Sequence, residues 1–461
     1  MTKPINISYN RIKVFYFSFL FLFIILFIFL FFNTNVHFQF LTTFLWSPNW
    51  GYITFSLDGI SLFFIILSTL LVPLCILVSW ESITIFTKEF YSLLFILWLL
   101  LILIFITLDL LIFYILFETI LIPMFLLIGI WGTREEKSKA AYYFFFYTLV
   151  GSLLLLLSIF KIYSLTGTTH YLLLITLELP IHYQFWFFLS FIFSFAIKIP
   201  MIPVHLWLPQ AHVEAPLTGS VLLAGILLKL GGYGFIRFLY PLFPLGFNYF
   251  TPFLLLLSLI AIIYGGLTTC RQNDMKRLIA YSSISHMGLV TLTIFTHSLE
   301  GLYSSIIMML AHGLISAGLF IIVGLLYIRF HTRTIRYIKG IVLFMPLLSL
   351  ISLILILSNS GFPLTLNFIA ELFSLLSAFN YSYSLGCLTS LGVLITTFYS
   401  FYFFNRLFFG NISSYIIFPR DLNYSEVSTL SPLLVLTLIL GLVPSILFNP
   451  LYLSCWLNIT L

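Results

Sequence analysis

Stretches of about 20 apolar residues recur along the whole chain, and this recurrence restricts the fold more than any other feature. About 20 such residues form an α-helix long enough to cross the hydrocarbon core of a bilayer. Of the 461 residues, 61% are hydrophobic and 7% are charged, whereas a soluble domain carries roughly 25% charged residues. So much apolar surface cannot be hidden from water, and we predict an all-α polytopic membrane protein.

We expect about thirteen transmembrane helices, two of which are irregular. The crossings are expected near 14–32, 57–80, 90–107, 109–131, 138–165, 184–210, 217–240, 250–270, 275–297, 301–329, 341–380, 384–409 and 429–449. Pro200 and Pro203 interrupt the crossing at 184–210, and the segment NSGFPLTLN at 359–367 interrupts the one at 341–380. Proline frees a backbone carbonyl in a helix, so each irregular crossing is predicted to be one broken helix.

Basic residues indicate how the chain is threaded, because Lys and Arg accumulate on one face of a membrane. If each irregular segment crosses once, all but four of the 20 Lys and Arg residues fall on the same face. Those residues are Lys3, Arg11, Lys13, Lys88, Arg134, Lys137, Lys139, Arg271, Lys276, Arg277, Arg329, Arg333, Arg336, Lys339, Arg406 and Arg420. The N-terminus is then on the positive face and the C-terminus on the other. Of the four exceptions, Lys161 and Arg237 lie near span ends and are expected to snorkel, whereas Lys198 and Lys229 lie too deep.

The two broken crossings also indicate an internal repeat. Each is the fourth of five successive crossings, and an odd number of crossings inverts the second set relative to the first. Inverted repeats with matching broken helices are typical of transporters, whose sites lie at the breaks. We therefore divide the chain into N-terminal membrane helices (1–89), a first five-helix repeat (90–240), a second, inverted five-helix repeat (250–409) and a C-terminal membrane helix (410–461).

Four titratable residues lie deep inside predicted crossings. Glu118 is about 13 Å from the end of its helix at 1.5 Å per residue, Lys198 precedes the first break, Lys229 lies mid-span, and Glu371 follows the second break. A charge at mid-bilayer costs about 2.5–3.5 kcal/mol, so these side chains must face a polar interior of the protein. We favour a path for protons over the alternative, static ion pairs that hold helices together.

Four histidines accompany these residues. His286 and His312 lie within crossings, where they either continue the polar path or fill tight helix contacts beside small residues. His205 and His212 follow the first break, and for them a functional and a structural role are equally compatible with the sequence.

Other polar residues carry no further chemistry. Asp109 and Glu214 lie near helix ends, where capping or solvation accounts for them as well as function does. The four cysteines are isolated in the sequence, so no disulfide framework, cysteine-bound metal or other cofactor is expected in this chain. The basic connectors are assigned to membrane topology and not to nucleic-acid binding.

Several segments resemble one known family. They are FETILIPMFLLIGIWG, KIPMIPVHLWLPQAHVEAPLTGSVLLAGILLKLGGYG, RQNDMKRLIAYSSISHMGLV and MLAHGL. Together they resemble the chain 4 family of NADH:ubiquinone oxidoreductase, respiratory complex I, and the likeness extends from about residue 57 to 410. The family is typically described with fourteen helices, and the first of them has no counterpart among the thirteen expected here.

The resemblance implies an antiporter-like, proton-translocating subunit of a translocase, with no redox centre in this chain. Glu118 and Lys198 would form a coupled pair, Lys229 the central relay, His286 and His312 its continuation, and Glu371 the terminal exchange site. Related antiporter-like chains usually have lysine at the position of Glu371, which favours chain 4 over chains 2 and 5. The implied partners are the other membrane-arm subunits, including neighbouring antiporter-like ones. Membrane lipids, with cardiolipin suggested by the basic connectors, are further candidates. The Phe-rich composition is similar to organelle-encoded versions, so we expect the mitochondrial inner membrane, with the N-terminus on the matrix side.

Three other functions remain open from the sequence. A subunit of an Mrp-type cation/proton antiporter would share the helices and the buried lysines. A purely structural membrane-arm subunit would use the buried charges only to fix helix register. A channel is the weakest alternative, because no filter motif is present and the repeat lies within one chain.

Overall fold

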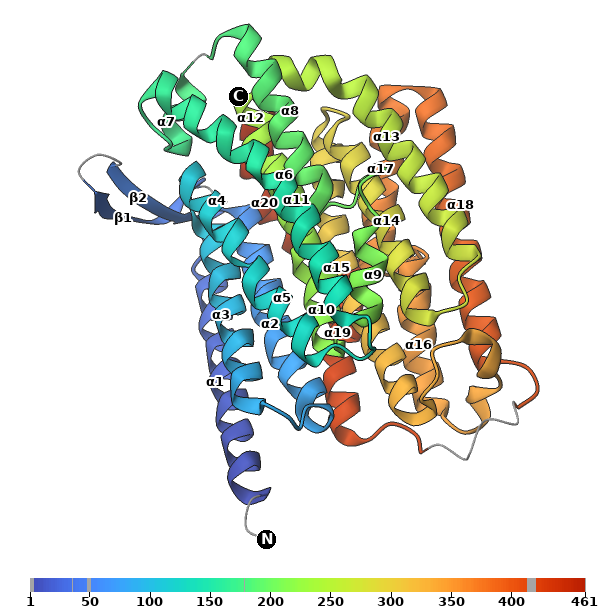
Figure 1. Ribbon diagram of the computed structural model, residues 1–461. Coiled ribbons are helices and arrows are strands. Elements are labelled where there is room, and N and C mark those ends of the chain that lie inside the picture. The colour runs from blue at the N-terminus through green and yellow to red at the C-terminus, as the bar shows by residue number, and fades with distance from the viewer. Residues whose placement is uncertain (1–3, 35, 48–50, 178, 413–419, 461) are drawn as a thin grey trace.

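The computed structural model describes residues 4–34, 36–47, 51–177, 179–412 and 420–460. Lys3, one of the basic residues assigned to the positive face, lies outside these ranges. The described chain is a bundle of long helices with one small β-hairpin at its edge (Figure 1). The all-α membrane fold predicted from hydropathy is therefore confirmed, since ten helical segments of the described chain are long and apolar enough to cross a membrane.

Most of the long helices coincide with expected crossings. The α-helices are α1 Pro4–Leu30, α2 Gly59–Ser82, α3 Thr87–Ile106, α4 Leu110–Thr119, α5 Leu121–Trp131, α6 Lys137–Thr166, α7 Tyr171–Thr176, α8 Ile181–Lys198, α9 Trp207–Glu214, α10 Leu217–Leu222, α11 Leu228–Gly234, α12 Tyr240–Leu242, α13 Pro244–Cys270, α14 Met275–Ile294, α15 Leu299–Phe330, α16 Pro346–Asn359, α17 Leu366–Tyr381, α18 Tyr383–Phe408, α19 Tyr424–Leu442 and α20 Ser445–Thr460. The strands are β1 Gln39–Ser47 and β2 Gly51–Leu57, two π-helical turns are η1 Leu223–Leu227 and η2 Phe235–Leu239, and two short 3₁₀ turns are η3 Ile335–Tyr337 and η4 Ile341–Leu343.

The number of thirteen crossings remains a prediction. Among the described residues, the ten apolar segments do not include the expected crossings at 184–210, 275–297 and 341–380. The first and third of these are each split into two helices, α8 with α9 and α16 with α17. The second is a single helix, α14, whose serines and histidine lower its hydropathy.

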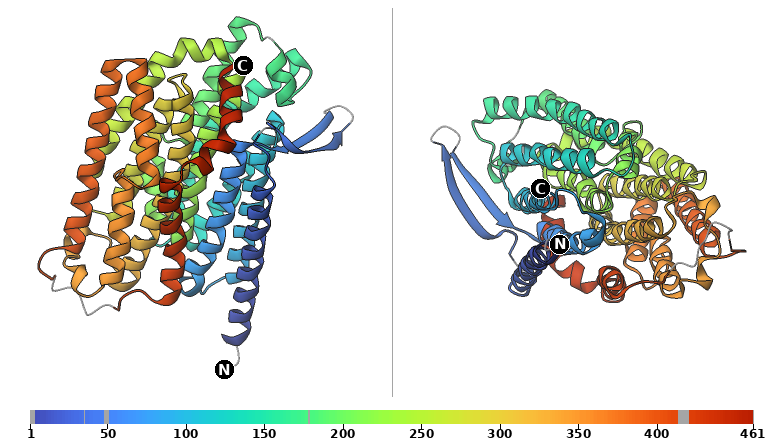
Figure 2. Two further views of the ribbon diagram at one scale, coloured as in Figure 1. Left: turned by 180° about the vertical axis from the view of Figure 1, so that it is seen from behind. Right: turned by 60° about the horizontal axis from the view of Figure 1, so that its bottom comes forward.

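The two chain ends lie at opposite ends of the bundle (Figure 1; Figure 2). The start of α1 is at the lower end in Figure 1, as are the connector between α5 and α6, which carries Arg134, and the connector between α15 and α16, which carries Arg333. The hairpin and the end of α20 lie toward the upper end. This arrangement agrees with the separation of charges that the sequence predicts.

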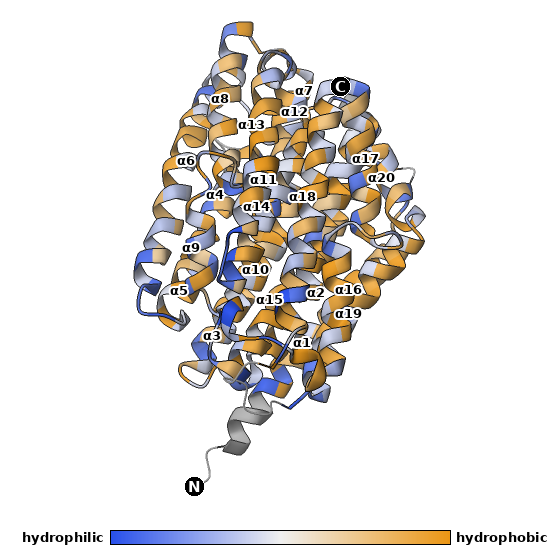
Figure 3. Cartoon of the chain, turned by 90° about the vertical axis from the view of Figure 1, so that its right-hand side faces the viewer, coloured by the Kyte–Doolittle hydropathy of each residue, from blue (hydrophilic) through white to orange (hydrophobic). Residues whose placement is uncertain are grey.

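The core of the bundle is formed by α15 and by the continuous segment α10–α12. Every residue in the most apolar window of both segments is buried, whereas few residues of α1 are. Hydrophobic residues also cover most of the outer helices (Figure 3), as expected for helices that contact lipid. The mid-span polar residues of α10–α12 and α15 therefore face protein and not the bilayer.

Both predicted breaks are present, and a side chain bridges each of them. In the first break, between α8 and α9, the Nε1 of Trp207 donates to the carbonyl of Ile197 at 2.9 Å. In the second, between α16 and α17, the Nδ2 of Asn367 donates to the carbonyl of Asn359 at 3.2 Å. Carbonyls that a helix end leaves unpaired are thus satisfied without water or lipid.

Two helix starts, one in each predicted repeat, have the same local structure. Asp109 accepts from two backbone N–H groups at the start of α4 and pairs with His170 in an isolated β-bridge. Asp274 also caps its helix, α14, by accepting from the backbone N–H of Lys276, and it pairs with Thr334 in an isolated β-bridge. The inverted repeats and the division of the chain into domains stay predictions. The capped starts of α4 and α14, each with an isolated β-bridge, support them.

Three features were not expected from the sequence. The connector at 33–56 forms an antiparallel hairpin, in which Phe44 pairs with Ile53. A short helix, α7, lies in the connector at 166–183, and the C-terminal crossing continues as a second helix, α20. Finally, the core segment 217–242 contains the π-helical turns η1 and η2 on either side of α11.

Candidate functional site

Lys229 lies at the centre of the bundle and is fully buried. Its Nζ donates to the carbonyl of Ala224 and lies 2.9 Å from the Nδ1 of His312. The π-helical turns η1 and η2 flank the α-helical turns that carry Lys229, and such turns frequently mark functional sites in helices. In the described chain, the amine therefore contacts two hydrogen-bond acceptors, the carbonyl of Ala224 and the imidazole of His312 in its neutral form, and it has no carboxylate partner.

The contacts of His312 lead onward from Lys229 to α14. Its Nε2 lies 3.1 Å from the hydroxyl of Ser283. The ring of His286, on the same helix α14, lies 5.6 Å from the ring of His312, centroid to centroid. Lys229, His312 and His286 thus form one buried cluster drawn from three helices, as the proton-path interpretation requires.

A tyrosine extends this cluster toward α18. The Nε2 of His286 lies 3.4 Å from the hydroxyl of Tyr399, which is itself 3.5 Å from the hydroxyl of Ser285. The Nδ1 of His286 is buried and has no partner in the described chain. Tyr399 also interacts electrostatically with Glu371. The phenol therefore contacts His286 and is also within electrostatic reach of Glu371.

Glu371 lies at the second break, where Asn367 positions it. The Nδ2 of Asn367 donates to the Oε1 of Glu371 at 2.9 Å and to the carbonyl of Asn359. Glu371 is 4% exposed, so its carboxyl group faces protein and not lipid. The side-chain amide of Asn367 therefore connects the carboxyl group of Glu371 with the backbone of the second break.

Glu118 and Lys198 form a second, separate pair. Lys198 ends α8, is buried, and places its Nζ 4.2 Å from the centroid of the Phe117 ring. Glu118, the next residue, interacts electrostatically with Lys198, but the two form no ion pair within 4 Å in the described chain. The Oε1 of Glu118 is buried without a hydrogen-bond partner among the described residues. The carboxyl group and the amine are thus neighbours that are not locked together.

The structure brings three of the six predicted residues, Lys229, His312 and His286, into one connected cluster, whereas no hydrogen bond among the described residues joins Glu371 to it. Glu118 and Lys198 are separate from this cluster, although α8, which ends at Lys198, packs against α11, which carries Lys229. No side-chain contact in the described chain joins Lys198 to Lys229, so a proton could pass between them only through water or by side-chain movement. Among the described residues, no three His, Cys, Asp or Glu side chains are placed to hold a metal ion.

Arg237 corrects a prediction, because it does not snorkel to the membrane surface. Its guanidinium is buried and donates to the carboxylate of Asp58 at 2.9 Å, with side-chain exposures of 2% and 0%. The rings of Phe38 and Tyr171 lie 5.0 and 5.1 Å from the guanidinium carbon. A partner at the start of α2, far away in the sequence, holds the charge inside the protein.

The remaining polar residues divide between capping and burial. Asp109 caps α4 and accepts from the hydroxyl of Thr169 at 2.8 Å, which confirms the capping interpretation. His212 is fully buried and stacks on Phe320 with the ring centroids 4.7 Å apart, and both of its nitrogens lack partners in the described chain. The Nδ1 of His205 is likewise unpaired there. These contacts leave the roles of both histidines open.

Sequence reasoning missed the uncharged members of the cluster. Ser283, Tyr399 and Asn367 carry no charge, and serine and tyrosine are frequent in this chain, so neither hydropathy nor charge singles them out. Asn367 lies in the segment NSGFPLTLN that was identified as a break. An amide within a predicted membrane break is the one signal that could have found it.

Comparison with known proteins identifies the class to which this fold and cluster belong. Residues 107–398 match the family described as NADH:quinone oxidoreductase/Mrp antiporter, TM. The chain therefore belongs to this family of antiporter-like membrane subunits.

Individual relatives narrow the match within the family and confirm the resemblance to chain 4. NADH-ubiquinone oxidoreductase chain 4 of Metridium senile is 56% identical over 401 residues, which are 87% of this chain and 82% of the relative. Chain 4 of Chondrus crispus is 50% identical over 419 residues, 90% and 85% of the two chains.

Solved structures share the fold. A chain of respiratory complex I from Thermus thermophilus with bound NADH superimposes with a TM-score of 0.90 at 31% identity and covers 98% of this chain and 95% of its own length. A chain of an Mrp complex from a Dietzia species gives a TM-score of 0.87 at 18% identity, over 96% and 91% of the two chains, a likeness of fold alone.

Proposed function

We propose that the chain is a proton-translocating, antiporter-like subunit of the membrane arm of a mitochondrial NADH:ubiquinone oxidoreductase. The observation that carries the proposal is the environment of Lys229. This amine is fully buried, contacts His312, and has no carboxylate within ion-pair distance in the described chain. A lysine in a purely structural role would be expected to pair with a carboxylate, as Arg237 does.

The cluster supports a direction of proton transfer. A change in the pairing of Glu118 and Lys198 alters the electrostatic field at Lys229, the next buried cation. Lys229 then exchanges a proton with His312, from which the contacts lead through His286 toward Glu371. Each group in this series is half-buried or buried, and each is able to gain or lose a proton.

The energies involved are adequate for this task. A shift of one pKa unit corresponds to about 1.4 kcal/mol, and moving one charge across about 100 mV costs about 2.3 kcal/mol. Changes in ion pairing that shift the pKa of a buried group by a few units are therefore sufficient to drive a proton against a membrane potential. Quinone reduction, in other chains of the complex, would supply the energy.

The assignment to complex I and not to an Mrp antiporter follows from the relatives. Chains named NADH-ubiquinone oxidoreductase chain 4 reach 56% identity, whereas the likeness to the Mrp chain is one of fold at 18% identity. The proposed location is the mitochondrial inner membrane, with the N-terminus on the matrix side and with other membrane-arm subunits as partners. We infer that the redox centres lie in those other chains.

The test is the number of protons pumped per electron by the complex reconstituted in vesicles. Substitution Lys229→Met removes the titratable amine at nearly constant volume, and we expect a lower ratio of protons to electrons. Lys161→Met is the matched control, because Lys161 lies exposed over the ring of Tyr183 at 5.3 Å and should leave the ratio unchanged. An unchanged ratio in an intact Lys229→Met complex would refute the role of this lysine.

Two further experiments separate the alternatives. Co-purification of the chain with NADH-oxidising activity is expected for complex I and not for a free-standing antiporter. Exchanging the residues at Glu118 and Lys198 preserves a pair of opposite charges, so a structural subunit would tolerate the exchange. A proton path, in which each position needs its own proton affinity, would not.

A further inference from the structure

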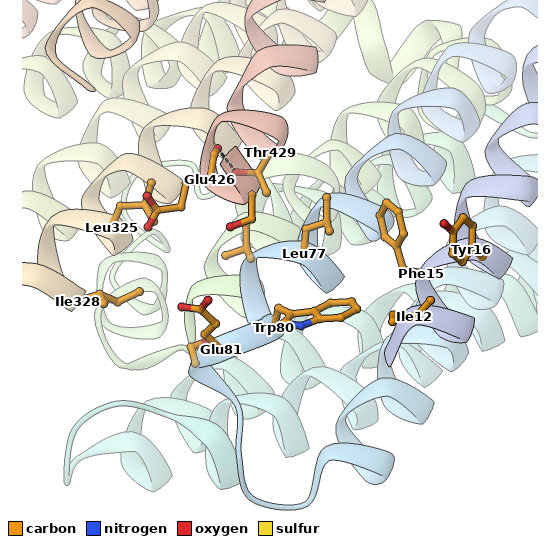
Figure 4. A pocket seen from close by; sticks show the side chains of 13 residues that line it. Ile12, Phe15, Tyr16, Leu77, Trp80, Glu81, Leu325, Ile328, Glu426 and Thr429 are labelled. Carbon is orange, nitrogen blue, oxygen red and sulfur yellow. Dashed lines mark hydrogen bonds between the residues drawn. The ribbon is translucent and has the colours of Figure 1, made fainter. Parts of the chain in front are cut away.

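The outer surface between α1 and α19, over α2 and α15, contains two separate cavities, and we refer to this surface as the groove. At its lower end is a cavity of about 420 Å³, lined by side chains of all four helices (Figure 4). Ile12, Phe15 and Tyr16 of α1 lie on one side of it, and Leu325 and Ile328 of α15 lie on the other. The cavity is at the end of the bundle where α2 finishes, on the side of the basic connectors.

The same four helices, joined by α20, form a second cavity deeper in the membrane. This cavity of about 160 Å³ is lined by leucine, isoleucine and phenylalanine side chains only, among them Phe29 and Leu314. Fourteen residues separate Phe15 from Phe29 on α1, and Ile328 from Leu314 on α15, which is about 20 Å along each helix. One leaflet of a bilayer, with its headgroups, is also about 20 Å thick. The two cavities, one partly polar and one apolar, are thus separated by about the length of one lipid in its leaflet.

The polar residues at the shallow end indicate the kind of headgroup. Glu81 and Glu426 line the cavity from α2 and α19, and the Glu81 carboxylate points into it (Figure 4). Glu426 already accepts from Arg329 at 2.6 Å, whereas Glu81 takes part in none of the ion pairs of the described chain. Trp80 and Tyr16 lie at the same level, and such aromatic residues are typical of the membrane interface.

We propose that this groove binds a phospholipid with a primary-amine headgroup, of the phosphatidylethanolamine type. The ammonium group donates to Glu81, one acyl chain follows the groove past Phe29, and the phosphate stays at the aqueous rim. A primary ammonium has N–H donors for a carboxylate, which a choline headgroup lacks. Cardiolipin carries phosphates and no cation, so it would place negative charge against Glu81 and Glu426.

The proposal is tested by photocrosslinking in the intact, reconstituted complex. Phosphatidylcholine vesicles contain a small fraction of a lipid with a photoactivatable diazirine at the end of one acyl chain, with an ethanolamine, a choline or a cardiolipin headgroup. We expect the ethanolamine probe to label the segments 66–70 and 436–440 about tenfold more than the choline probe, a ratio that corresponds to about 1.4 kcal/mol.

Two variants and one control make the result specific. Glu81→Gln should bring the ethanolamine and choline probes to nearly equal labelling, while Glu300→Gln, at the opposite end of α15, should leave the preference intact. Leu70→Trp fills the deep cavity and should abolish labelling by every probe. Equal labelling by ethanolamine and choline probes in the unmodified complex, stronger labelling by cardiolipin, or a groove occupied by a helix of a neighbouring subunit would each overturn the proposal.

Discussion

The buried ion pair between Asp58 and Arg237 provides a quantitative test of how this bundle tolerates charge. Its atoms are 2.9 Å apart, and both side chains are almost completely buried. Removing one partner of such a pair leaves an uncompensated buried charge, which typically costs 3–5 kcal/mol, while replacing both with neutral residues can cost little or nothing. We therefore expect Arg237→Met to be strongly destabilising and the double variant Asp58→Asn/Arg237→Met to be much less so.

The choice of asparagine isolates the effect of charge. Asp58 also caps α2 by accepting from the backbone N–H of Ser61 at 3.0 Å, and asparagine is about as good an N-cap as aspartate. The cap is therefore retained in Asp58→Asn and in the double variant. If the double variant is more stable than Arg237→Met, the gain in stability then comes from removing the negative charge of Asp58, which has lost its partner.

Thiol labelling of Cys75 can measure the effect in the intact complex. Cys75 lies on α2, the helix that Asp58 caps, and is 1% exposed. A thiol reagent therefore reaches Cys75 only when the structure around α2 opens. A loss of 3 kcal/mol in the opening free energy would raise the labelling rate about 100-fold when opening is in equilibrium. If Arg237→Met and the double variant label at the same rate, the two side chains do not compensate each other and the reasoning is wrong.

Three other substitutions have defined outcomes. Arg333→Met removes a hydrogen bond of 2.7 Å to the carbonyl of Val213 at the end of α9, and we expect a loss of about 1.5–3 kcal/mol, measured as faster protease cleavage near that break. Gly361→Ala should lower the ratio of protons to electrons, because Gly361 has a φ of +68° and an added Cβ would lie 2.0 Å from the Oε2 of Glu371. An unchanged ratio would show that the position of the Glu371 carboxylate is unimportant for pumping. Tyr399→Phe removes the hydroxyl next to His286, and turnover coupled to pumping should slow about tenfold or more, whereas uncoupled NADH oxidation should not.

Hydropathy and charge predicted the helices well because both are local properties of the sequence. The ends of α2, α6 and α15 fall within a few residues of the expected spans, and the two breaks occur where proline and the segment NSGFPLTLN placed them. The hairpin β1–β2 was missed because its apolar alternation is hidden in a chain with 54 phenylalanines.

The errors at the site come from contacts between distant parts of the chain. Arg237 was expected to snorkel because Asp58, its partner, precedes it by more than five crossings. Tyr399, which contacts His286, and Asn367, which donates to Glu371, were missed because their importance arises only from their neighbours in three dimensions. Charged residues could be identified from the sequence, but the neutral groups that connect them could not.

The account requires that the buried titratable groups share one hydrated interior. A density map of the complex at a resolution that shows ordered water tests this most directly. We predict water molecules between Lys198 and Lys229, where no side chain provides a contact, and between Tyr399 and Glu371. Tightly packed apolar side chains without water between Lys198 and Lys229, in every state of the turnover cycle, would contradict the account.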